Sequence, residues 1–216
     1  MVNDPCMELV CARHGRTAWN AVRRFQGQTD IPLDDEGQAQ AQALAAHLRP
    51  ERFDLAVSSD LTRARTTAEA IVSGRVGLTL ELDPALREMR FGAWEGLTWA
   101  EIVERWPELS EKYEYSPRNY VPEGGEGWDA LCERIEAAMR RVTARLAPDG
   151  RALIVSHAGV MHAILHVVGS ANGENGDLAV RVRLAPASVL RVRGSFEDGW
   201  TIDAINETAA PLRTTA

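Results

Sequence analysis

Three short apolar runs, each followed by a segment with helical periodicity, constrain the fold of this chain most. The runs cover residues 7–12, 53–58 and 151–156. Continuous apolar runs of this length are typical of strands that are buried on both faces, and strands that alternate with helices pair in parallel. We therefore predict an α/β fold, a three-layer α/β/α sandwich with a mixed, mainly parallel sheet.

The segments between and after these runs complete the predicted order of elements. Helix formers at apolar spacing favour helices, and alternating or β-branched stretches favour strands. The predicted helices cover residues 35–48, a segment after the N-cap residue Asp60, residues 98–106 from a Thr98 capping box, and residues 128–146 and 160–168. The further predicted strands cover residues 78–82, 178–184, 188–192 and 200–205, with turns at Pro186 and Gly194 among the last three.

Residues 97–127 interrupt the alternation of strands and helices. From residue 107 on they contain three Pro, three Gly and three Tyr with little periodicity, which is typical of a loop or lid. No repeat, low-complexity tract or linker divides the rest of the 216 residues. We expect residues 1–216 to form one domain with a lid or insertion at about 97–127.

Composition argues against several classes of protein. Lys plus Arg number 24 and Asp plus Glu 31, which gives a net charge of −7 and argues against a nucleic acid or an anionic membrane as partner. No apolar run is long enough to span a bilayer, and the N-terminus carries an acid where a secretory signal carries a base, so we expect a cytoplasmic protein. Cys6, Cys11 and Cys132 lack the spacing of a metal site or a disulfide framework and are expected to be small buried side chains.

Charged and imidazole side chains follow the ends of the three buried strands. Arg13 and His14 follow the first strand, Arg63 lies shortly after the second, and His157 follows the third. Ligand sites of parallel sheets lie outside the carboxyl ends of the strands, so we expect these side chains to meet. Guanidinium forks and imidazoles suit a phosphate group more than a metal ion.

The motifs around these residues resemble the histidine phosphatase superfamily, in its phosphoglycerate-mutase-like branch. The resemblance spans residues 7–168 and rests on several linked motifs in the family's order. They are Arg13-His-Gly-x-Thr-x-x-Asn20, Gln26-Gly-x-x-Asp30-x-Pro-Leu33, Gly37-x-x-Gln-Ala41, Ser58-Ser-Asp-Leu-x-Arg-Ala64, Leu86-x-Glu-x-x-x-Gly-x-Trp-Glu-Gly96, Gly124-Gly-Glu126 and Val155-Ser-His-Ala-Gly159. The resemblance implies the three-layer fold predicted above.

The resemblance also implies a role for each matching residue. His14 is implied to be the nucleophile that becomes a phosphohistidine, and Glu88 to donate a proton to the leaving oxygen. The residues implied to surround the phosphate or to contact the substrate are Arg13, Asn20, Gln26, Gly27, Arg63, His157 and Ala158. Two arginines and a second histidine supply the positive charge that a metal would bring, so neither metal nor cofactor is expected.

Two alternatives concern single residues. Glu95 lies in the same motif as Glu88 and is an alternative for the acid, with a structural ion pair as its other interpretation. His162 and His166 are four residues apart on a predicted helix, a spacing found in metal sites, but no third ligand suggests itself. The role implied for Glu88 also predicts a pH dependence. A free glutamate is mostly ionised at neutral pH, and only a protonated carboxyl can donate a proton, so the reaction rate is expected to fall above neutral pH.

The resemblance covers both phosphatases and phosphoglycerate mutases. The mutases carry a longer insertion with a basic pair, whereas Lys112 and Arg118 stand isolated in this chain, and His162 and Gly127 stand where Arg and Ser are usual in the family. We therefore expect a metal-independent phosphomonoester hydrolase for a small phosphorylated metabolite, acting as a monomer or homodimer. A cofactor-dependent phosphoglycerate mutase is the alternative, and a non-catalytic module that binds a phosphorylated ligand is less favoured.

Overall fold

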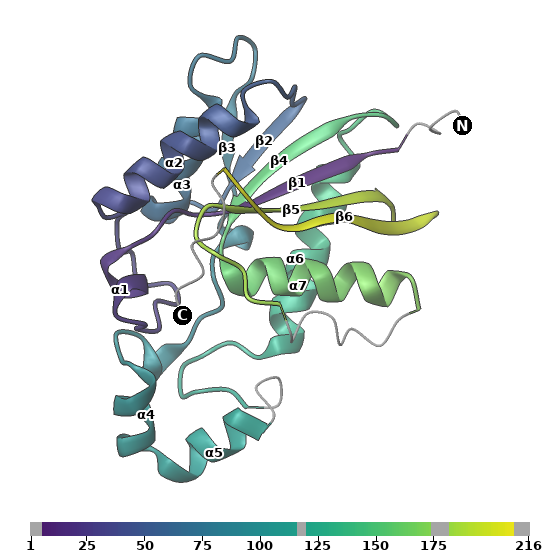
Figure 1. Ribbon diagram of the computed structural model, residues 1–216. Helices are drawn as coiled ribbons and strands as arrows, with labels where there is room; N and C mark the ends of the chain where they lie inside the picture. The colour runs from purple at the N-terminus through teal and green to yellow at the C-terminus, as the bar shows by residue number, and fades with distance from the viewer. Residues whose placement is uncertain (1–5, 116–119, 174–181, 210–216) are drawn as a thin grey trace.

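A six-stranded sheet forms the centre of the molecule in a computed structural model that describes residues 6–115, 120–173 and 182–209 (Figure 1). The strands are β1 (Glu8–Arg13), β2 (Leu55–Ser58), β3 (Leu80–Leu82), β4 (Arg151–Ser156), β5 (Ser188–Ser195) and β6 (Gly199–Thr208). Their order in the sheet is β3-β2-β4-β1-β5-β6. The first four run parallel to one another, and β5 runs antiparallel to both β1 and β6. The prediction of a mixed, mainly parallel sheet is confirmed.

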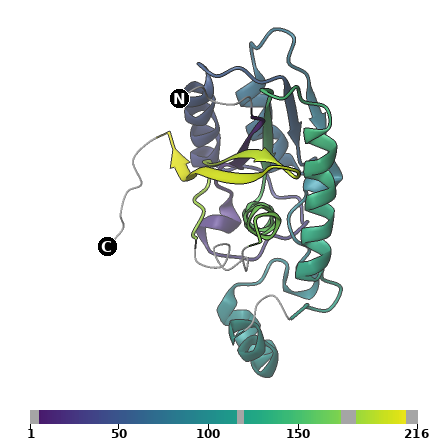
Figure 2. The ribbon, with the colours of Figure 1, turned by 90° about the vertical axis from the view of Figure 1, so that its right-hand side faces the viewer.

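Helices cover both faces of this sheet (Figures 1 and 2). The helices are α1 (Ala18–Ala21), α2 (Asp35–Leu48), α3 (Thr62–Val72), α4 (Trp99–Arg105), α5 (Pro107–Tyr115), α6 (Trp128–Thr143) and α7 (Ala158–Ala171), with short 3-10 turns η1 (Pro84–Leu86) and η2 (Gly92–Trp94). Helices α2 and α3 pack on one face, and α6 and α7 pack on the other. The three-layer prediction is therefore confirmed as well.

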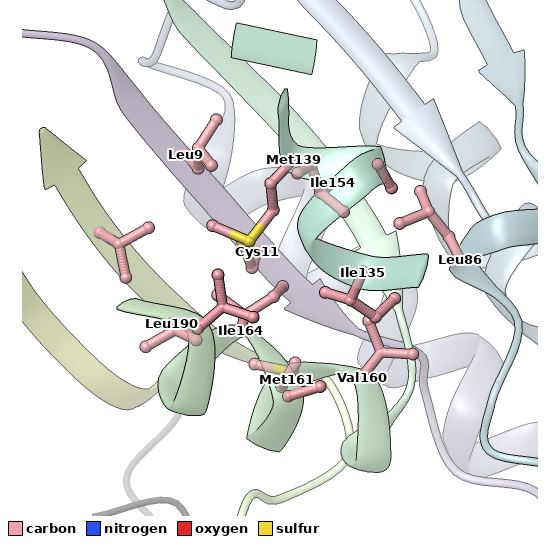
Figure 3. Close-up of a cluster of buried hydrophobic side chains, with 14 of the residues drawn as sticks. Leu9, Cys11, Leu86, Ile135, Met139, Ile154, Val160, Met161, Ile164 and Leu190 are labelled. Carbon is pink, nitrogen blue, oxygen red and sulfur yellow. The ribbon is translucent and has the colours of Figure 1, made fainter. Parts of the chain in front are cut away.

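Alternate residues of β1 point into the two cores. Leu9 and Cys11 pack with α6 and α7, whereas Val10 and Ala12 pack with α2 and α3, as the period of two along a strand requires. Figure 3 shows the first core, with Leu9 and Cys11 beside side chains from α6 and α7. Burial raises the pKa of the Cys11 thiol to about 12, so Cys11 is the small buried side chain expected. Cys6 and Cys132 are only half-buried, which corrects the expectation for these two.

Helices α4 and α5 extend away from the three layers (Figures 1 and 2). The Thr98 capping box is present: its hydroxyl accepts the N–H of Glu101, and the Glu101 carboxylate accepts the N–H of Thr98. The prediction of a loop from residue 107 is wrong for residues 107–115, which form α5. Pro107 occupies the first position of this helix, where a proline lacks no hydrogen bond and does not break the helix.

Several other boundaries differ from the sequence prediction. Helix α3 begins after Leu61, and Asp60 does not cap it, because the capping oxygens come from Asp30. Helix α7 begins at Ala158 rather than at residue 160, since a glycine in the first turn obscured its start. Of the predicted strand 178–184, residues 178–181 lie outside the described residues, and residues 182–184 are irregular. Gly194 lies within β5, and the turn to β6 follows it.

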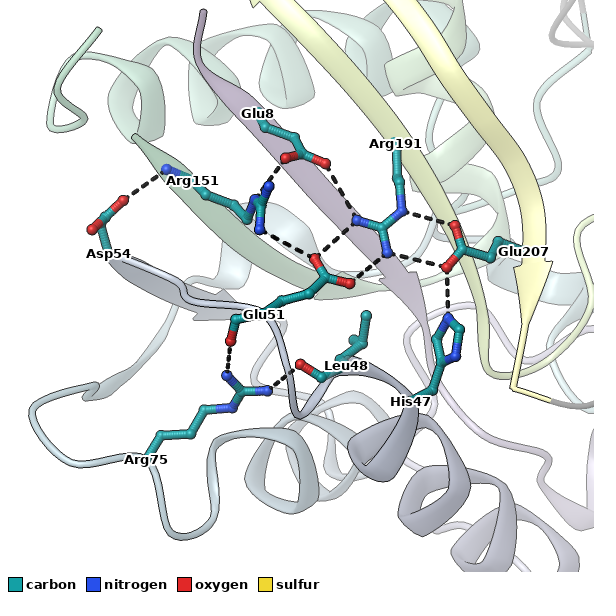
Figure 4. A network of polar contacts seen from close by, with 9 residues as sticks. All are labelled: Glu8, His47, Leu48, Glu51, Asp54, Arg75, Arg151, Arg191 and Glu207. Carbon is teal, nitrogen blue, oxygen red and sulfur yellow. Dashed lines mark hydrogen bonds and ion pairs between the residues drawn. The ribbon is translucent and has the colours of Figure 1, made fainter. Parts of the chain in front are cut away.

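A network of ion pairs extends from Glu8, at the start of β1, across the β5–β6 hairpin (Figure 4). Arg191 of β5 contacts Glu8 at 3.3 Å, Glu51 at 2.7 Å and Glu207 at 2.8 Å. His47, in the last turn of α2, lies 2.6 Å from Glu207. The network thereby joins β1, the β5–β6 hairpin, the end of α2 and the segment that precedes β2. No helix among the described residues is long and apolar enough to cross a membrane.

Candidate active site

The register of the sheet brings two histidines together at its carboxyl edge. β1 and β4 pair in parallel with Arg13 opposite Ser156, so His14 and His157 lie one residue beyond this pair. Their ring centroids are 5.1 Å apart. The N–H of His14 donates to the carbonyl of Ser156 at 2.9 Å, which extends the ladder past the strand end and fixes the backbone of His14.

The ring of His14 is buried and has a defined orientation. Its Nδ1 lies 2.7 Å from the carbonyl oxygen of Gly15. A carbonyl can only accept, so Nδ1 carries the proton and Nε2 keeps its lone pair. Burial, followed by the charges of Arg63 and Arg13, holds the pKa of His14 well below its usual value of 6.5. At neutral pH the ring is therefore uncharged, with Nε2 in the form that a nucleophile requires.

Close backbone packing supports the loop that carries His14. A Cβ atom on Gly15 would lie 2.4 Å from the carbonyl oxygen of Gly37, near the start of α2. The N–H of Gly15 donates to the hydroxyl of Thr67 on α3 at 3.1 Å. The glycine of the Arg-His-Gly motif is thus required by contact with α2, and the loop is held between two helices.

Arg63, on the first turn of α3, is the most enclosed cation of the site. Its side chain is fully buried, with Nη1 donating to the carbonyl of Thr29 at 2.8 Å and Nη2 to that of Gly27 at 2.7 Å. Its Nε donates to Nδ1 of His157 at 3.3 Å. Burial lowers the pKa of Arg63, an effect that the nearby carboxylate of Glu88 opposes. Neutral acceptors fix this guanidinium and leave its charge uncompensated by any ion pair among the described residues.

Arg13, the last residue of β1, has fewer partners. Its Nη1 donates to the carbonyl of Leu184, and its buried Nε has no hydrogen-bond partner among the described residues. Burial lowers the pKa of Arg13 to about 10, and the charges of Arg63 and Arg183 act in the same direction. The N–H of Ala187 donates to the carbonyl of His14 at 3.1 Å, so the segment before β5 is fastened to both motif residues.

His157, the residue before α7, contacts the second strand end. Its Nε2 lies 2.9 Å from the hydroxyl of Ser59, and its Nδ1 accepts from Arg63. An accepting Nδ1 places the proton of the neutral ring on Nε2, which then donates to Ser59. Burial is the largest cause that lowers the pKa of His157 well below 6.5, and the charge of Arg63 adds to it. Both histidines of the site are thus neutral at physiological pH.

Glu88 faces the same cluster from the loop after η1. Only 9% of its surface is exposed. Its Oε1 accepts the N–H of Met89 at 2.9 Å, and its Oε2 accepts the N–H of Gly159 at 3.2 Å. A Cβ atom on Gly159 would lie 2.3 Å from Oε1, so a glycine there admits the carboxyl group. Arg134 of α6 holds the backbone of Glu88 by a hydrogen bond of 3.1 Å to its carbonyl oxygen.

The other residues predicted to contact substrate have structural positions of their own. Asn20 Oδ1 accepts from the N–H and hydroxyl of Thr17, which closes a capping box on α1. Gln26, mostly buried, accepts from the same hydroxyl at 2.9 Å. Ala158 is the first residue of α7, where a backbone N–H has no acceptor within the helix. Contact of these residues with substrate stays a prediction.

Glu95 and His162 have structural partners. The carboxylate of Glu95 accepts hydrogen bonds from the backbone N–H groups of Gln28, Thr29 and Phe91, so the expected ion pair is replaced by neutral donors. Nε2 of His162 lies 2.8 Å from the carbonyl of Val182. Within the described residues, no group of three or more His, Cys, Asp or Glu side chains is arranged to hold a metal ion.

Sequence reasoning missed the groups that hold the predicted residues in place. Ser59 contacts His157, the carbonyls of Gly27 and Thr29 contact Arg63, and that of Leu184 contacts Arg13. Ser59 stands in a matching motif and could have been found as the residue beyond a strand end. The carbonyl groups have no signal in the sequence, since every residue carries one.

Comparison with known proteins agrees with this geometry. The family model of the histidine phosphatase superfamily, branch 1, matches residues 9–208. The chain belongs to this superfamily. The resemblance seen in the sequence motifs is confirmed, and the histidine phosphatase match extends it through the C-terminal strands β5 and β6.

Relatives in the histidine phosphatase superfamily include both hydrolases and mutases. A metal-independent phosphoserine phosphatase of Arabidopsis thaliana is 33% identical over 96% of this chain and 84% of its own length. A probable phosphoglycerate mutase of Photorhabdus laumondii is 33% identical over 93% of each chain. The structure of a mycobacterial glucosyl-3-phosphoglycerate phosphatase in complex with VO3 superposes with a TM-score of 0.82 at 30% identity, covering 93% of this chain and 99% of that one. These likenesses support a phosphatase acting on a small phosphorylated metabolite and keep the mutase alternative open.

Some departures from the family pattern fall within residues 97–127. Gly127 precedes α6 and makes no side-chain cap there, since a glycine has no side chain to do so. Lys112 is exposed on α5, and Arg118 lies outside the described residues. Residues 97–127 of this histidine phosphatase thus carry few described cations that could hold a second anionic group of a substrate.

Proposed function

We propose that this protein is a metal-independent phosphomonoesterase that transfers the phosphoryl group of a small metabolite to His14 and then to water. The observation that carries the proposal is the orientation of His14, whose protonated Nδ1 on Gly15 leaves the lone pair of Nε2 available beside Arg13 and Arg63. Phosphoryl transfer needs positioning and charge stabilisation more than covalent chemistry. This arrangement provides both within a buried site.

The first step breaks the P–O ester bond and forms a P–N bond to Nε2 of His14. Arg13 and Arg63 stabilise the negative charge on the equatorial oxygens, and Glu88 gives its proton to the leaving oxygen. Each carboxyl oxygen of Glu88 accepts one backbone N–H and retains a lone pair that can hold the proton. The product alcohol then leaves.

The second step hydrolyses the phosphohistidine. A water attacks phosphorus, its proton passes to the Glu88 carboxylate, and the P–N bond breaks to give inorganic phosphate and neutral His14. Glu88 thus returns to its acid form, as microscopic reversibility requires. His157 neighbours His14 and orients Arg63 through its Nδ1, and the N–H of Ala158 is a further donor for a phosphate oxygen.

A phosphoglycerate mutase is the second candidate, favoured by the relative from Photorhabdus laumondii. A mutase returns the phosphoryl group to another hydroxyl and must keep water out while it does so. We favour hydrolysis because the described lid carries few cations for a substrate carboxylate. A single domain over residues 1–216 with a lid at about 97–127, a cytoplasmic location, and a monomeric or dimeric state all stay predictions.

Product analysis tests the proposal. Wild-type protein is incubated with phosphoserine, phosphoglycerates, sugar phosphates and nucleotides, and both inorganic phosphate and isomerised product are measured. We expect phosphate release that falls by at least about 10⁴-fold in His14→Ala, because no other group takes over a lost nucleophile efficiently. His47→Ala, which changes the histidine of the network in Figure 4, is the matched control and should keep the wild-type rate.

Two outcomes would overturn the proposal. Interconversion of 3- and 2-phosphoglycerate without phosphate release would identify a mutase. Wild-type rates in the His14→Ala variant would remove His14 from the reaction altogether.

A further inference from the structure

The carboxylate of Glu95, directly after η2, accepts four hydrogen bonds. Its Oε1 accepts the N–H of Gln28 at 3.1 Å and that of Phe91 at 3.0 Å. Its Oε2 accepts the N–H of Thr29 at 3.0 Å and the hydroxyl of the same residue at 2.6 Å. Three of the four donors belong to two consecutive residues, so this carboxylate fixes the conformation of one loop.

That loop, residues 27–29, is the one that holds Arg63. The carbonyls of Gly27 and Thr29 accept from Nη2 and Nη1 of Arg63 at 2.7 and 2.8 Å. The peptide groups that donate to Glu95 therefore belong to the same short segment whose carbonyls accept from the guanidinium. A displacement of the loop would move both acceptors of Arg63 together.

The fit between loop and carboxylate is close. Gly27 has a φ of 52°, and a Cβ atom there would lie 2.1 Å from Oε1 of Glu95. A glycine is thus required both by the left-handed backbone and by the approach of the carboxylate. On its other side, the loop continues into Asp30, whose carboxylate accepts the N–H and hydroxyl of Thr62 on α3 at 2.8 and 2.7 Å. Carboxylates thus fix the backbone from Gln28 to Asp30.

We propose that Glu95 is a positioning residue for phosphoryl transfer, because it holds the loop 27–29 whose carbonyls aim the guanidinium of Arg63 at the phosphate. The inference rests on the proposed function, in which Arg63 stabilises the transferring group. Glu95 does not touch the substrate in this account, and it acts only through the loop. The carboxylate of Glu95 also lies near enough to Arg63 to favour its charged form.

A carboxylate fits this position best because three of the four groups around it are backbone N–H groups, which can only donate. A glutamine would place an NH₂ group where one oxygen now accepts two hydrogen bonds, so donor would face donor. In Glu95→Gln the side chain keeps its size while the loop loses part of its attachment. This change should move Arg63 by a fraction of an ångström, a displacement that strongly affects groups which bind a transition state.

Glu101 offers a matched control. Its carboxylate also accepts backbone and side-chain hydrogen bonds, from Thr98, and pairs with Arg24 at 2.7 Å. It lies on α4 in the lid and makes no contact with the loop 27–29. Glu101→Gln therefore removes a similar set of local contacts without disturbing the setting of Arg63.

The experiment is a double-mutant cycle of Glu95→Gln and Arg63→Met, with kcat, KM, inhibition by vanadate and the melting temperature measured for each variant. We expect Glu95→Gln to lower kcat about 10- to 100-fold, as for groups that orient a binding residue, with a smaller change in KM. Vanadate affinity should fall in parallel. In the Arg63→Met background the Glu95 substitution should have no further effect, whereas Glu101→Gln should leave kcat unchanged in both backgrounds.

Thr29→Val supplies a second test should Glu95→Gln fold poorly. It removes only the hydroxyl that donates to Glu95 and retains the carbonyl that accepts from Arg63. The loss of one hydrogen bond to a charged group predicts a fall in kcat of roughly 5-fold or more, again absent in the Arg63→Met background.

Two results would overturn the inference. The first is an equal loss from Glu95→Gln with and without Arg63. The second is a loss of stability in Glu95→Gln while kcat stays at the wild-type value. Failure of the proposed function is recognised separately, either by wild-type activity in His14→Ala or by isomerised phosphoglycerate without phosphate release.

Discussion

The two ends of β1 carry charged groups in opposite arrangements. The strand begins at Glu8, in the network around Arg191, and ends at Arg13, in the candidate active site. In the network, the guanidinium of Arg191 contacts three carboxylates. At the other end, Arg13 and Arg63 are held by carbonyl oxygens and a neutral histidine. The same strand thus joins a site of paired charges to a site of unpaired ones.

The pKa directions report the same contrast. Hydrogen bonds to Glu51 and Glu207 raise the pKa of Arg191, and Arg191 holds the pKa of Glu207 at about 2. Burial lowers the pKa of Arg13 to about 10. In the network each ion favours the charged form of its partner, whereas in the active site burial opposes the charge. We infer that the charged groups at the amino end of β1 stabilise the fold. Those at its carboxyl end keep positive charge available for an anion and lower the stability of the fold.

Substitution of Arg13 should produce the largest effect and show that its charge serves catalysis. Arg13→Met retains an apolar stem and removes a guanidinium whose Nε has no hydrogen-bond partner among the described residues. We expect kcat to fall about 10²–10³-fold, as when one group that stabilises a transition-state charge is lost. The melting temperature should not fall, because a partly buried, incompletely paired cation is removed. A large loss of stability with little change in kcat would contradict the contrast between the two ends of β1.

The reciprocal change at Arg191 should affect stability alone. Arg191→Met would remove the cation that contacts all three carboxylates, and would leave Arg151 beside Glu8 and Glu51 and His47 beside Glu207. We expect the free energy of unfolding to fall by roughly 3 kcal/mol, as for a mostly buried ion pair that loses one partner. Urea denaturation measures this loss, and kcat measured at a temperature where the variant is folded should equal the wild-type value. A variant as stable as the wild-type protein would mean that the ion pairs of Arg191 make no net contribution to the free energy of unfolding.

The two regions should also lose stability in different pH ranges. His14 and His157 stay neutral in the folded protein, whereas the unfolded chain protonates them near pH 6.5. Below that pH the unfolded chain binds more protons, so the free energy of unfolding falls by about 1.4 kcal/mol per pH unit for each histidine. The contribution of Glu207, whose folded pKa is about 2, is retained down to about pH 4.5 and lost below it.

Denaturation at several pH values between 4.5 and 7.5 separates these contributions. In this range the stability of His14→Ala should depend on pH less steeply than that of the wild-type protein. The difference in slope should equal the contribution of one histidine. Identical slopes for both proteins would show that His14 takes up a proton in the folded state.

The smallest expected effect concerns His47 at the edge of the network. Its side chain is 35% exposed and contacts Glu207. Ion pairs at such positions contribute up to about 1 kcal/mol, and solvent screens them. His47→Ala should therefore lower the melting temperature only slightly, which thermal denaturation of the two proteins measures. A loss of stability as large as that of Arg191→Met would show that His47, although partly exposed, is as important to the network as Arg191.

The sequence predicted the elements whose signals are local. The apolar runs located β1, β2 and β4, and the helix formers between residues 35 and 48 located α2 with the bounds found in the structure. The cap of α3 was assigned to Asp60 because it is adjacent in sequence. The group that accepts from Thr62 belongs to Asp30, from a loop that tertiary structure brings to the helix, and no local rule identifies such a partner.

The same distinction holds for the site. His14, Arg63 and His157 could be expected to meet because each follows a strand in one parallel sheet. Their orientations could not be predicted, since carbonyl groups and the hydroxyl of Ser59 fix them. From the sequence, Glu95 is either an alternative acid or half of an ion pair. Its four hydrogen bonds to neutral donors depend on the path of the loop 27–29, which only the structure shows.

Direct trapping of the phosphorylated enzyme tests the central claim. Protein is mixed with radiolabelled phosphomonoester, quenched within the first turnover, and the label is located after proteolysis. The account predicts label on the peptide that contains His14, through a linkage that acid cleaves and alkali does not, and no label in His14→Ala. Label of equal amount in the His14→Ala variant, or label at another residue of the wild-type protein, would contradict it.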